Sequence, residues 1–220
     1  MRTSRRLAVA ASLAVALLWT LLGVTPVLAD SIGFDITVPN AALVGFPAPY
    51  AHVDVNRTST TAATITFTGL TTGAFTYAFG AVNAIDVNVN ATTFTVGGIS
   101  PSATLSSGGS GNVSGFGVLN ATLNNSDGFS DRFSTGSFTV TDTSGTWASA
   151  SDVLALNSDG FRAAAHIFVT GASCGDAACT TGFAGDGPTP VPEPVTMLLF
   201  GSSLLGVGIA ARKNLARSAA

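Results

Sequence analysis

Short runs in which apolar and polar residues alternate constrain the fold of this 220-residue chain more than any other feature. Alternation with a period of two is typical of β-strands, because successive side chains point to opposite faces of a sheet. We therefore predict an all-β fold in which each strand turns one face to a core and the other to water. The clearest runs are residues 34–38, 64–68, 75–79, 85–90 and 138–141.

Turn residues separate these runs, and no long stretch repeats its apolar residues with the 3.6-residue period of a helix. Only residues 147–156 favour one short helix, and the glycine- and serine-rich residues 106–115 are predicted to form a flexible loop. We expect a single β-sandwich of roughly eight to ten strands in residues 30–187, with jelly-roll topology as one option. The predicted turns contain Gly69, Gly73, Gly97-Gly98, Asp127-Gly128 and Asp159-Gly160.

The first 29 residues have the pattern of a signal peptide. Arginines at positions 2, 5 and 6 precede an uncharged apolar stretch, residues 7–22, and the segment ends in Val-Leu-Ala. A basic start, an apolar centre and a cleavage sequence in this order are typical of export signals. We expect cleavage between Ala29 and Asp30. A retained membrane anchor is the alternative, and the shortness of the apolar stretch disfavours it.

Residues 188–220 combine a proline-flanked acid, an apolar run and a basic end. Glu193 is the only glutamate of the chain and stands between Pro192 and Pro194. The next 17 residues, 195–211, carry no charge, and as a helix they would reach about 26 Å, enough to cross a thin bilayer. A basic cluster follows. Because such clusters stay on the cytoplasmic side, the preceding domain is expected outside the cytoplasm. The cluster consists of Arg212, Lys213 and Arg217.

This order of Pro-Glu-Pro, short span and basic cluster resembles the tail of PEP-CTERM proteins. The resemblance implies a substrate of an exosortase, a membrane-embedded thiol transpeptidase that cuts the chain near the motif. It also implies export across the inner membrane of a Gram-negative bacterium, anchoring there by the tail, and later release to the cell surface or extracellular space. Members of this family are associated with exopolysaccharide and biofilm. The alternative is a permanent single-pass anchor in which Glu193 belongs to a linker.

Between the two ends the charges are strongly unequal. Residues 30–190 contain eleven Asp and three Arg, with no Glu and no Lys, which makes a net charge of −8. Nucleic acid is disfavoured as a partner, because binding to phosphates relies on Lys and Arg. An acidic surface outside the cell suits solubility and the binding of divalent cations.

Calcium is the one cofactor that this composition leaves open, and two patterns bear on it. The sequence Asn-Ser-Asp-Gly-Phe occurs at residues 125–129 and again at 157–161, and Asp86, Asn88 and Asn90 share one face of a predicted strand. Neither pattern has the ligand spacing of a known calcium loop. We therefore favour ordinary hairpin turns for the repeat and a solvated strand face for the other three residues.

Cys174 and Cys179 are the only cysteines. In an exported chain they favour a local disulfide that stiffens the end of the domain. A zinc site would have to add His52 and His166, which are distant in sequence, and the cysteine spacing is unusual for zinc.

Residues 171–175 match the five-residue pattern of a hydrolase nucleophile elbow, with Ser173 at its centre. The elbow requires a following helix and a parallel sheet, and neither is predicted here. His166 is expected to pack or form a hydrogen bond at a sheet face. Paired carboxylates for a glycosidase cannot be nominated either, because the domain has no Glu and every candidate is an Asp without a distinguishing neighbourhood. We expect a non-enzymatic surface or matrix protein. The alternatives are a secreted polysaccharide-active hydrolase and a calcium-dependent adhesion module.

Overall fold

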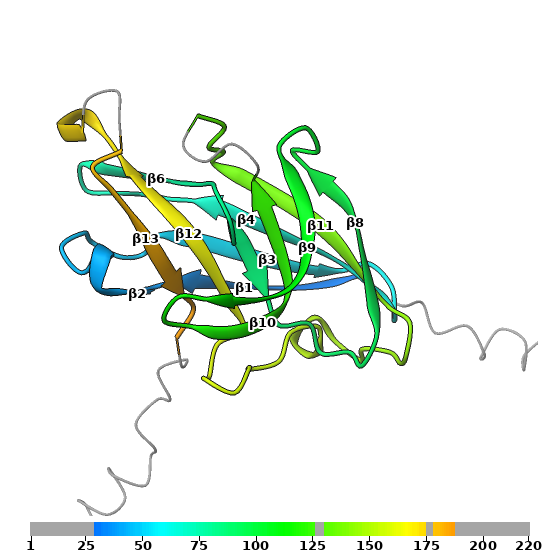
Figure 1. Cartoon of the computed structure of the whole chain (residues 1–220). Helices are drawn as coiled ribbons and strands as arrows, with labels where there is room; N and C mark the ends of the chain where they lie inside the picture. The colour runs from blue at the N-terminus through cyan, green and yellow to red at the C-terminus, as the bar shows by residue number, and fades with distance from the viewer. Residues whose placement is uncertain (1–28, 126–129, 175–177, 188–220) are drawn as a thin grey trace, which may run out of the picture. The chain divides into compact units, whose positions relative to one another are not determined.

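The computed structural model describes residues 29–125, 130–174 and 178–187, which form β-strands, loops and three short 3-10 helices (Figure 1). The 3-10 helices are η1 (Ala41–Leu43), η2 (Ala150–Asp152) and η3 (Ala172–Cys174). The predicted signal peptide, sorting motif, apolar span and basic cluster all lie outside the described residues. Within the described residues, no helix is long and apolar enough to span a membrane.

The strands form two sheets, and every strand pairing in the described residues is antiparallel. Sheet A has the order β1 (Asp30–Ile36), β3 (Ala51–Arg57), β4 (Ala62–Gly69), β11 (Thr135–Asp142) and β8 (Phe94–Ser100). Sheet B has the order β2 (Val38–Pro39), β13 (Thr180–Gly185), β12 (Ala163–Thr170), β7 (Ile85–Val87), β10 (Gly117–Asn125) and β9 (Leu105–Val113). Its two remaining strands are β6 (Phe75–Phe79), which also pairs with β12, and β5 (Thr71–Thr72), which pairs with β6.

One apolar core lies between the inner faces of the two sheets. In β4, Ala63, Ile65 and Phe67 are fully buried, whereas the threonines between them are partly exposed. The Phe67 ring meets the ring of Phe79 from sheet B edge-on, with a centroid separation of 6.1 Å. This is the alternation that the sequence predicts, and the prediction of an all-β fold is confirmed.

Sheet A is anchored at its first residue. The Asp30 carboxylate accepts hydrogen bonds from the backbone N–H of Ala150 at 2.7 Å and from Nε of Arg57 at 2.6 Å. The bond from Ala150, assisted by the Arg57 guanidinium, lowers the pKa of Asp30 below its usual value. A charged Asp30 therefore ties the start of β1 both to β3 and to η2.

The prediction of a flexible loop in residues 106–115 is wrong, because most of this segment forms β9. The glycines allow β9 to approach β10 closely: a Cβ on Gly111 would lie only 2.9 Å from Cγ2 of Thr122. Glycine carries no side chain and therefore contributes nothing to an alternating pattern. The glycines of β9 therefore remove the alternating pattern from the sequence, and the same glycines allow the strand to pack closely against β10.

Three smaller differences concern element lengths. The run 85–90 ends as a strand at Val87, and Val89 makes only an isolated bridge to Leu154. The predicted helix in 147–156 is reduced to the single turn η2, because the Val153 carbonyl and the Ala155 N–H form backbone hydrogen bonds with Asn90 and Asn88 instead of continuing the helix. Thirteen strands occur in the described residues instead of roughly eight to ten, since several contain only two or three residues.

Gly69, at the end of β4, has no room for a side chain. A Cβ there would lie 3.0 Å from the carbonyl carbon of Tyr77 and closer still to its oxygen, both of them backbone atoms. We expect Gly69→Ala to lower the free energy of unfolding by about 1–3 kcal/mol, because the backbone must move to make space. Urea unfolding of the purified protein measures this change.

Gly97 in β8 is the matched control, since a Cβ there meets no atom within 4 Å. Gly97→Ala should change the same free energy by less than about 0.5 kcal/mol. Equal effects of the two substitutions would contradict the packing described here.

Candidate functional site

A polar groove of about 730 Å³ is the candidate binding site of the described residues. It forms where the loop after β7 meets the loop after β11 and the turn η2. The lining residues are Asn88, Val89, Asn90, Ala91, Thr92, Asp142, Ser144, Gly145, Thr146, Trp147, Ala148, Asp152 and Ala155.

Trp147 holds the two sides of the groove together. Its side chain is only 2% exposed, and its indole Nε1 donates a hydrogen bond of 2.8 Å to the carbonyl oxygen of Asn90. Its backbone N–H donates to the carbonyl oxygen of Thr60 at 2.7 Å. A buried indole needs such a partner for its N–H, and this one joins loops that are 57 residues apart in the chain.

Two asparagine side chains use their amino groups for structure. Nδ2 of Asn90 donates to the carbonyl of Asp152 at 2.9 Å, and Nδ2 of Asn88 donates to the carbonyl of Ala155 at 3.1 Å. In the described part of the chain, neither Oδ1 atom accepts a hydrogen bond. Both side-chain oxygens are therefore available to a ligand in the groove.

Each of the two acids of the groove, Asp142 and Asp152, accepts hydrogen bonds through one of its carboxylate oxygens. Oδ1 of Asp142 accepts hydrogen bonds from the backbone N–H of Ser144 at 2.7 Å, from that of Gly145 at 2.9 Å and from the Ser144 hydroxyl. The Ser144 backbone bond is the main reason that the pKa of Asp142 is lowered. Oδ2 of Asp152 accepts from the N–H and the hydroxyl of Ser149, both at 2.8 Å.

The chemistry of this lining selects among ligands. It offers amide, hydroxyl and carboxylate groups, and it contains no Lys, Arg or His. Anionic ligands such as phosphates therefore find no cation in the groove. Ligands rich in hydroxyl groups find both hydrogen-bond donors and acceptors.

The histidines considered for zinc lie on different sheets. His52 in β3 forms a hydrogen bond through Nδ1 with the Asp35 carboxylate at 2.5 Å on the outer face of sheet A. His166 in β12 stacks on Phe183 with a centroid separation of 4.3 Å, and burial lowers its pKa. His166 is thus packed at a sheet face, as expected. Among the described residues, no group of three or more His, Cys, Asp or Glu is placed to hold a metal ion.

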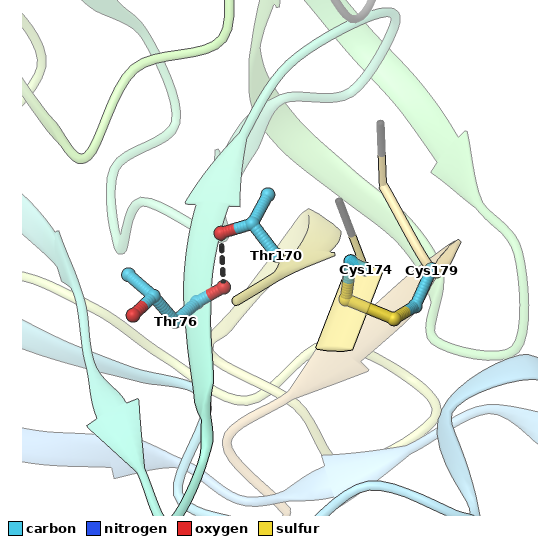
Figure 2. Close-up of a disulfide and its surroundings, with 4 residues drawn as sticks. All are labelled: Thr76, Thr170, Cys174 and Cys179. Carbon is cyan, nitrogen blue, oxygen red and sulfur yellow. Dashed lines mark hydrogen bonds between the residues drawn. A yellow bond between two sulfur atoms is a disulfide. The ribbon is translucent and has the colours of Figure 1, made fainter. Parts of the chain in front are cut away.

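Cys174 and Cys179 are joined by a disulfide between the end of β12 and the start of β13, with their Cα atoms 4.8 Å apart (Figure 2). Beside it, the Thr170 hydroxyl donates to the carbonyl of Thr76 at 2.7 Å and ties β12 to β6. The two cross-links stiffen one end of sheet B.

Ser173 does not lie in a nucleophile elbow. It is an exposed residue of the 3-10 turn η3, which follows β12, and all pairings of β12 are antiparallel. An elbow instead joins a strand of a parallel sheet to a helix.

The second Asn-Ser-Asp-Gly-Phe copy is a turn, as its composition predicts. Oδ1 of Asn157 accepts hydrogen bonds from the N–H groups of Asp159 and Phe161, both at 3.0 Å. The Phe161 ring packs against Phe116 with a centroid separation of 4.9 Å. Asp127 of the first copy lies outside the described residues.

The expectation of a solvated face for Asp86, Asn88 and Asn90 is wrong at Asp86, whose side chain is fully buried. Strand β7 is flanked by β10 on one side and by β12 on the other. Asn88 and Asn90 lie beyond the end of β7 and line the groove. An alternating pattern identifies two faces of a strand, but it does not reveal that both are covered.

The described residues thus define an all-β, two-sheet protein with a polar groove. Residues 190–213 match the family model described as the PEP-CTERM protein-sorting motif, which confirms the resemblance found in the C-terminal tail. No curated protein and no solved structure matches the chain.

Asp142 makes a pH-dependent contribution to stability. Because its pKa is lowered, the ionised carboxylate of Asp142 stabilises the fold at pH values above its usual pKa of 3.8. This stabilisation is lost as the pH falls through the folded-state pKa. Asp142→Ala should therefore destabilise the protein clearly at pH 7, and the difference from wild type should shrink at pH 3. Urea unfolding at the two pH values measures it.

Asp159→Ala serves as the control, because it removes an equal charge from an exposed turn. It should change stability little at either pH. A loss for Asp142→Ala that is the same at pH 3 and pH 7 would mean that hydrogen bonding to the charged carboxylate is not the cause.

Proposed function

We propose that this protein is exported, held in the inner membrane by its C-terminal tail, and cut by an exosortase-like transpeptidase. It then reaches the cell surface or the extracellular matrix, where the two-sheet domain has a structural or binding role linked to exopolysaccharide and biofilm. The match of residues 190–213 to a sorting motif carries the proposal, since this motif marks substrates of exosortase. Signal cleavage after Ala29 and the apolar run 195–211 supply the remaining steps of the route.

The scaffold proposed for this role is a β-sandwich. One core joins the two sheets, and the chain crosses between them repeatedly, for example from β7 to β8 and on to β9, as a jelly-roll requires. The disulfide between Cys174 and Cys179 and the excess of Asp over Arg are in keeping with an extracellular domain.

The groove is the proposed contact with exopolysaccharide. Free Oδ1 atoms of Asn88 and Asn90, with the hydroxyls of Thr92 and Thr146, match the hydroxyl groups of a sugar chain. The lack of cations in the lining favours a neutral or amino-sugar polymer over an acidic one.

A polysaccharide hydrolase is the second candidate, because Asp142 and Asp152 line the same groove. A glycosidase needs one carboxyl with a raised pKa that keeps its proton near neutral pH. Hydrogen bonds instead lower the pKa of Asp142, so this residue does not fit the role of the general acid. A calcium-dependent adhesion module, the third candidate, predicts that chelation lowers both the melting temperature and the binding.

We expect no turnover when the protein is incubated with the exopolysaccharide of its host, and retention on that polymer in a pull-down. Asn90→Ala should weaken the retention, because it removes the free amide oxygen from the groove. Asn56→Ala on β3, outside the groove, is the control and should not change it. Release of reducing sugars that disappears in Asp152→Asn would establish the hydrolase instead.

Glu193→Ala tests the sorting proposal. Export and folding should be unchanged, while the chain stays uncut and keeps residues 195–220, because the processing enzyme loses its recognition residue. Intact-mass measurement of the protein from envelope and medium of the native host reads both ends of the chain. Thr189→Ala, just outside the motif, should be processed like wild type. A Glu193→Ala protein cut at the wild-type position would contradict the proposal.

A further inference from the structure

Asp86 is a fully buried acid, and within the described part of the chain its two carboxyl oxygens have no hydrogen-bond partner. It occupies the middle of β7, directly opposite Thr122 on β10 and Ala164 on β12. Native structures rarely bury a carboxyl without a partner, because the charged form loses its hydration and gains nothing in return. The sorting motif and the groove do not account for this residue.

The hairpin formed by β9 and β10 covers the outer face of sheet B beside Asp86. Three of its residues, Val113, Phe116 and Leu119, form an apolar cluster with Ala164, the cross-strand neighbour of Asp86. Figure 1 shows the end of this hairpin passing in front of β12 and β13. Gly185 of β13 makes room for it, since a Cβ there would lie 2.5 Å from Cδ1 of Phe116.

Among the residues that the structure describes, the strands packed around Asp86 supply no opposite charge. Residues 105–125, which include the whole hairpin, contain no charged or titratable residue. On β12 the one titratable group is His166, two positions along from Ala164, and burial against Phe183 lowers its pKa and favours the neutral ring. Beyond the hairpin tip, Asp159 lies against Gly117. Arg162 is paired with Asp186 at 2.8 Å.

The neutral form of Asp86 is therefore the one that fits. Burial raises the pKa of its carboxyl well above the usual 3.8, and the backbone amide of Leu123 opposes this only in part, without forming a hydrogen bond. Loss of the proton would place an unpaired negative charge in an apolar environment. Such a charge is strongly unfavourable unless water hydrates it.

We expect the hairpin, rather than β12, to move and admit water, although Asn157 donates hydrogen bonds to the carbonyls of Phe116 and Val118 near its tip. Strand β9 is an edge strand with three glycines, and its pairing with β10 is irregular between Leu119 and Leu123. In contrast, β12 is held on both edges and by core residues of both sheets. Local opening follows the weakest contacts of a fold.

We propose that Asp86 is a proton-operated latch. While its carboxyl is protonated, the β9–β10 hairpin stays closed on sheet B. When the proton is lost, the hairpin opens and uncovers the apolar surface of Val113, Phe116, Leu119 and Ala164. The latch is independent of the sorting route and of ligand binding in the groove.

Linkage sets the direction of the effect. Because the folded-state pKa is raised, the closed state has its full stability below the unfolded value of 3.8 and loses it as the pH rises toward the folded-state value. In this window the population of the open hairpin should rise up to about tenfold per pH unit, and above it the population should level off.

Hydrogen exchange of the full chain between pH 4 and pH 9, corrected for the intrinsic exchange rate, tests the latch on peptides covering residues 105–119. Wild-type protection should fall with rising pH as described. Asp86→Asn keeps the shape without the titration, and Asp86→Val replaces the acid by an apolar residue that favours strands. Both variants should show protection that is independent of pH. One folded variant of the two is sufficient for the comparison.

Asp54→Asn is the matched control, because Asp54 is an exposed acid on β3 of sheet A. It should keep the wild-type pH profile of the hairpin. Two results would overturn the proposal: wild-type hairpin protection that does not change with pH, or the same pH dependence in the folded Asp86 variants as in wild type.

Discussion

The strand β12 is packed on both faces, by sheet A on one side and by the β9–β10 hairpin on the other. Its first three residues, Ala163, Ala164 and Ala165, are fully buried, and their small side chains let both layers approach closely. Strand β7 pairs with this stretch and shares its cover. Because both faces of sheet B are covered at this position, the carboxyl of Asp86 is buried. The groove begins where the chain leaves the sheet at the end of β7.

The regular part of this architecture could be predicted from sequence. In β4 and β11 one face is buried and the other partly exposed, so that the alternation of residues such as Ile65 and Thr66 reports the strand directly. Strand β9 was missed because glycine leaves no pattern, although glycine is what lets it pack. Asp86 was misplaced because alternation describes one strand at a time, whereas burial depends on which segments cover it.

The candidate site lay beyond sequence reasoning for a different reason. Asn90, Asp142 and Trp147 meet only because strands distant in the chain are neighbours in the fold, and no local spacing records this meeting. The sorting tail is the opposite case, since residues 190–213 match the sorting motif as one continuous segment of the sequence. A function that is read from a linear segment is visible in a sequence, and a function that requires a folded site is not.

The anchoring of Asp30 bears on the export route proposed above. With cleavage after Ala29, the first residue of the mature chain is also the first residue of β1, bonded to Arg57 and to the backbone of Ala150. Aminopeptidases need a loose end that can enter an active site as an extended strand. A chain that begins inside a sheet presents no such end, so the amino terminus that the proposed cleavage would create is protected from trimming.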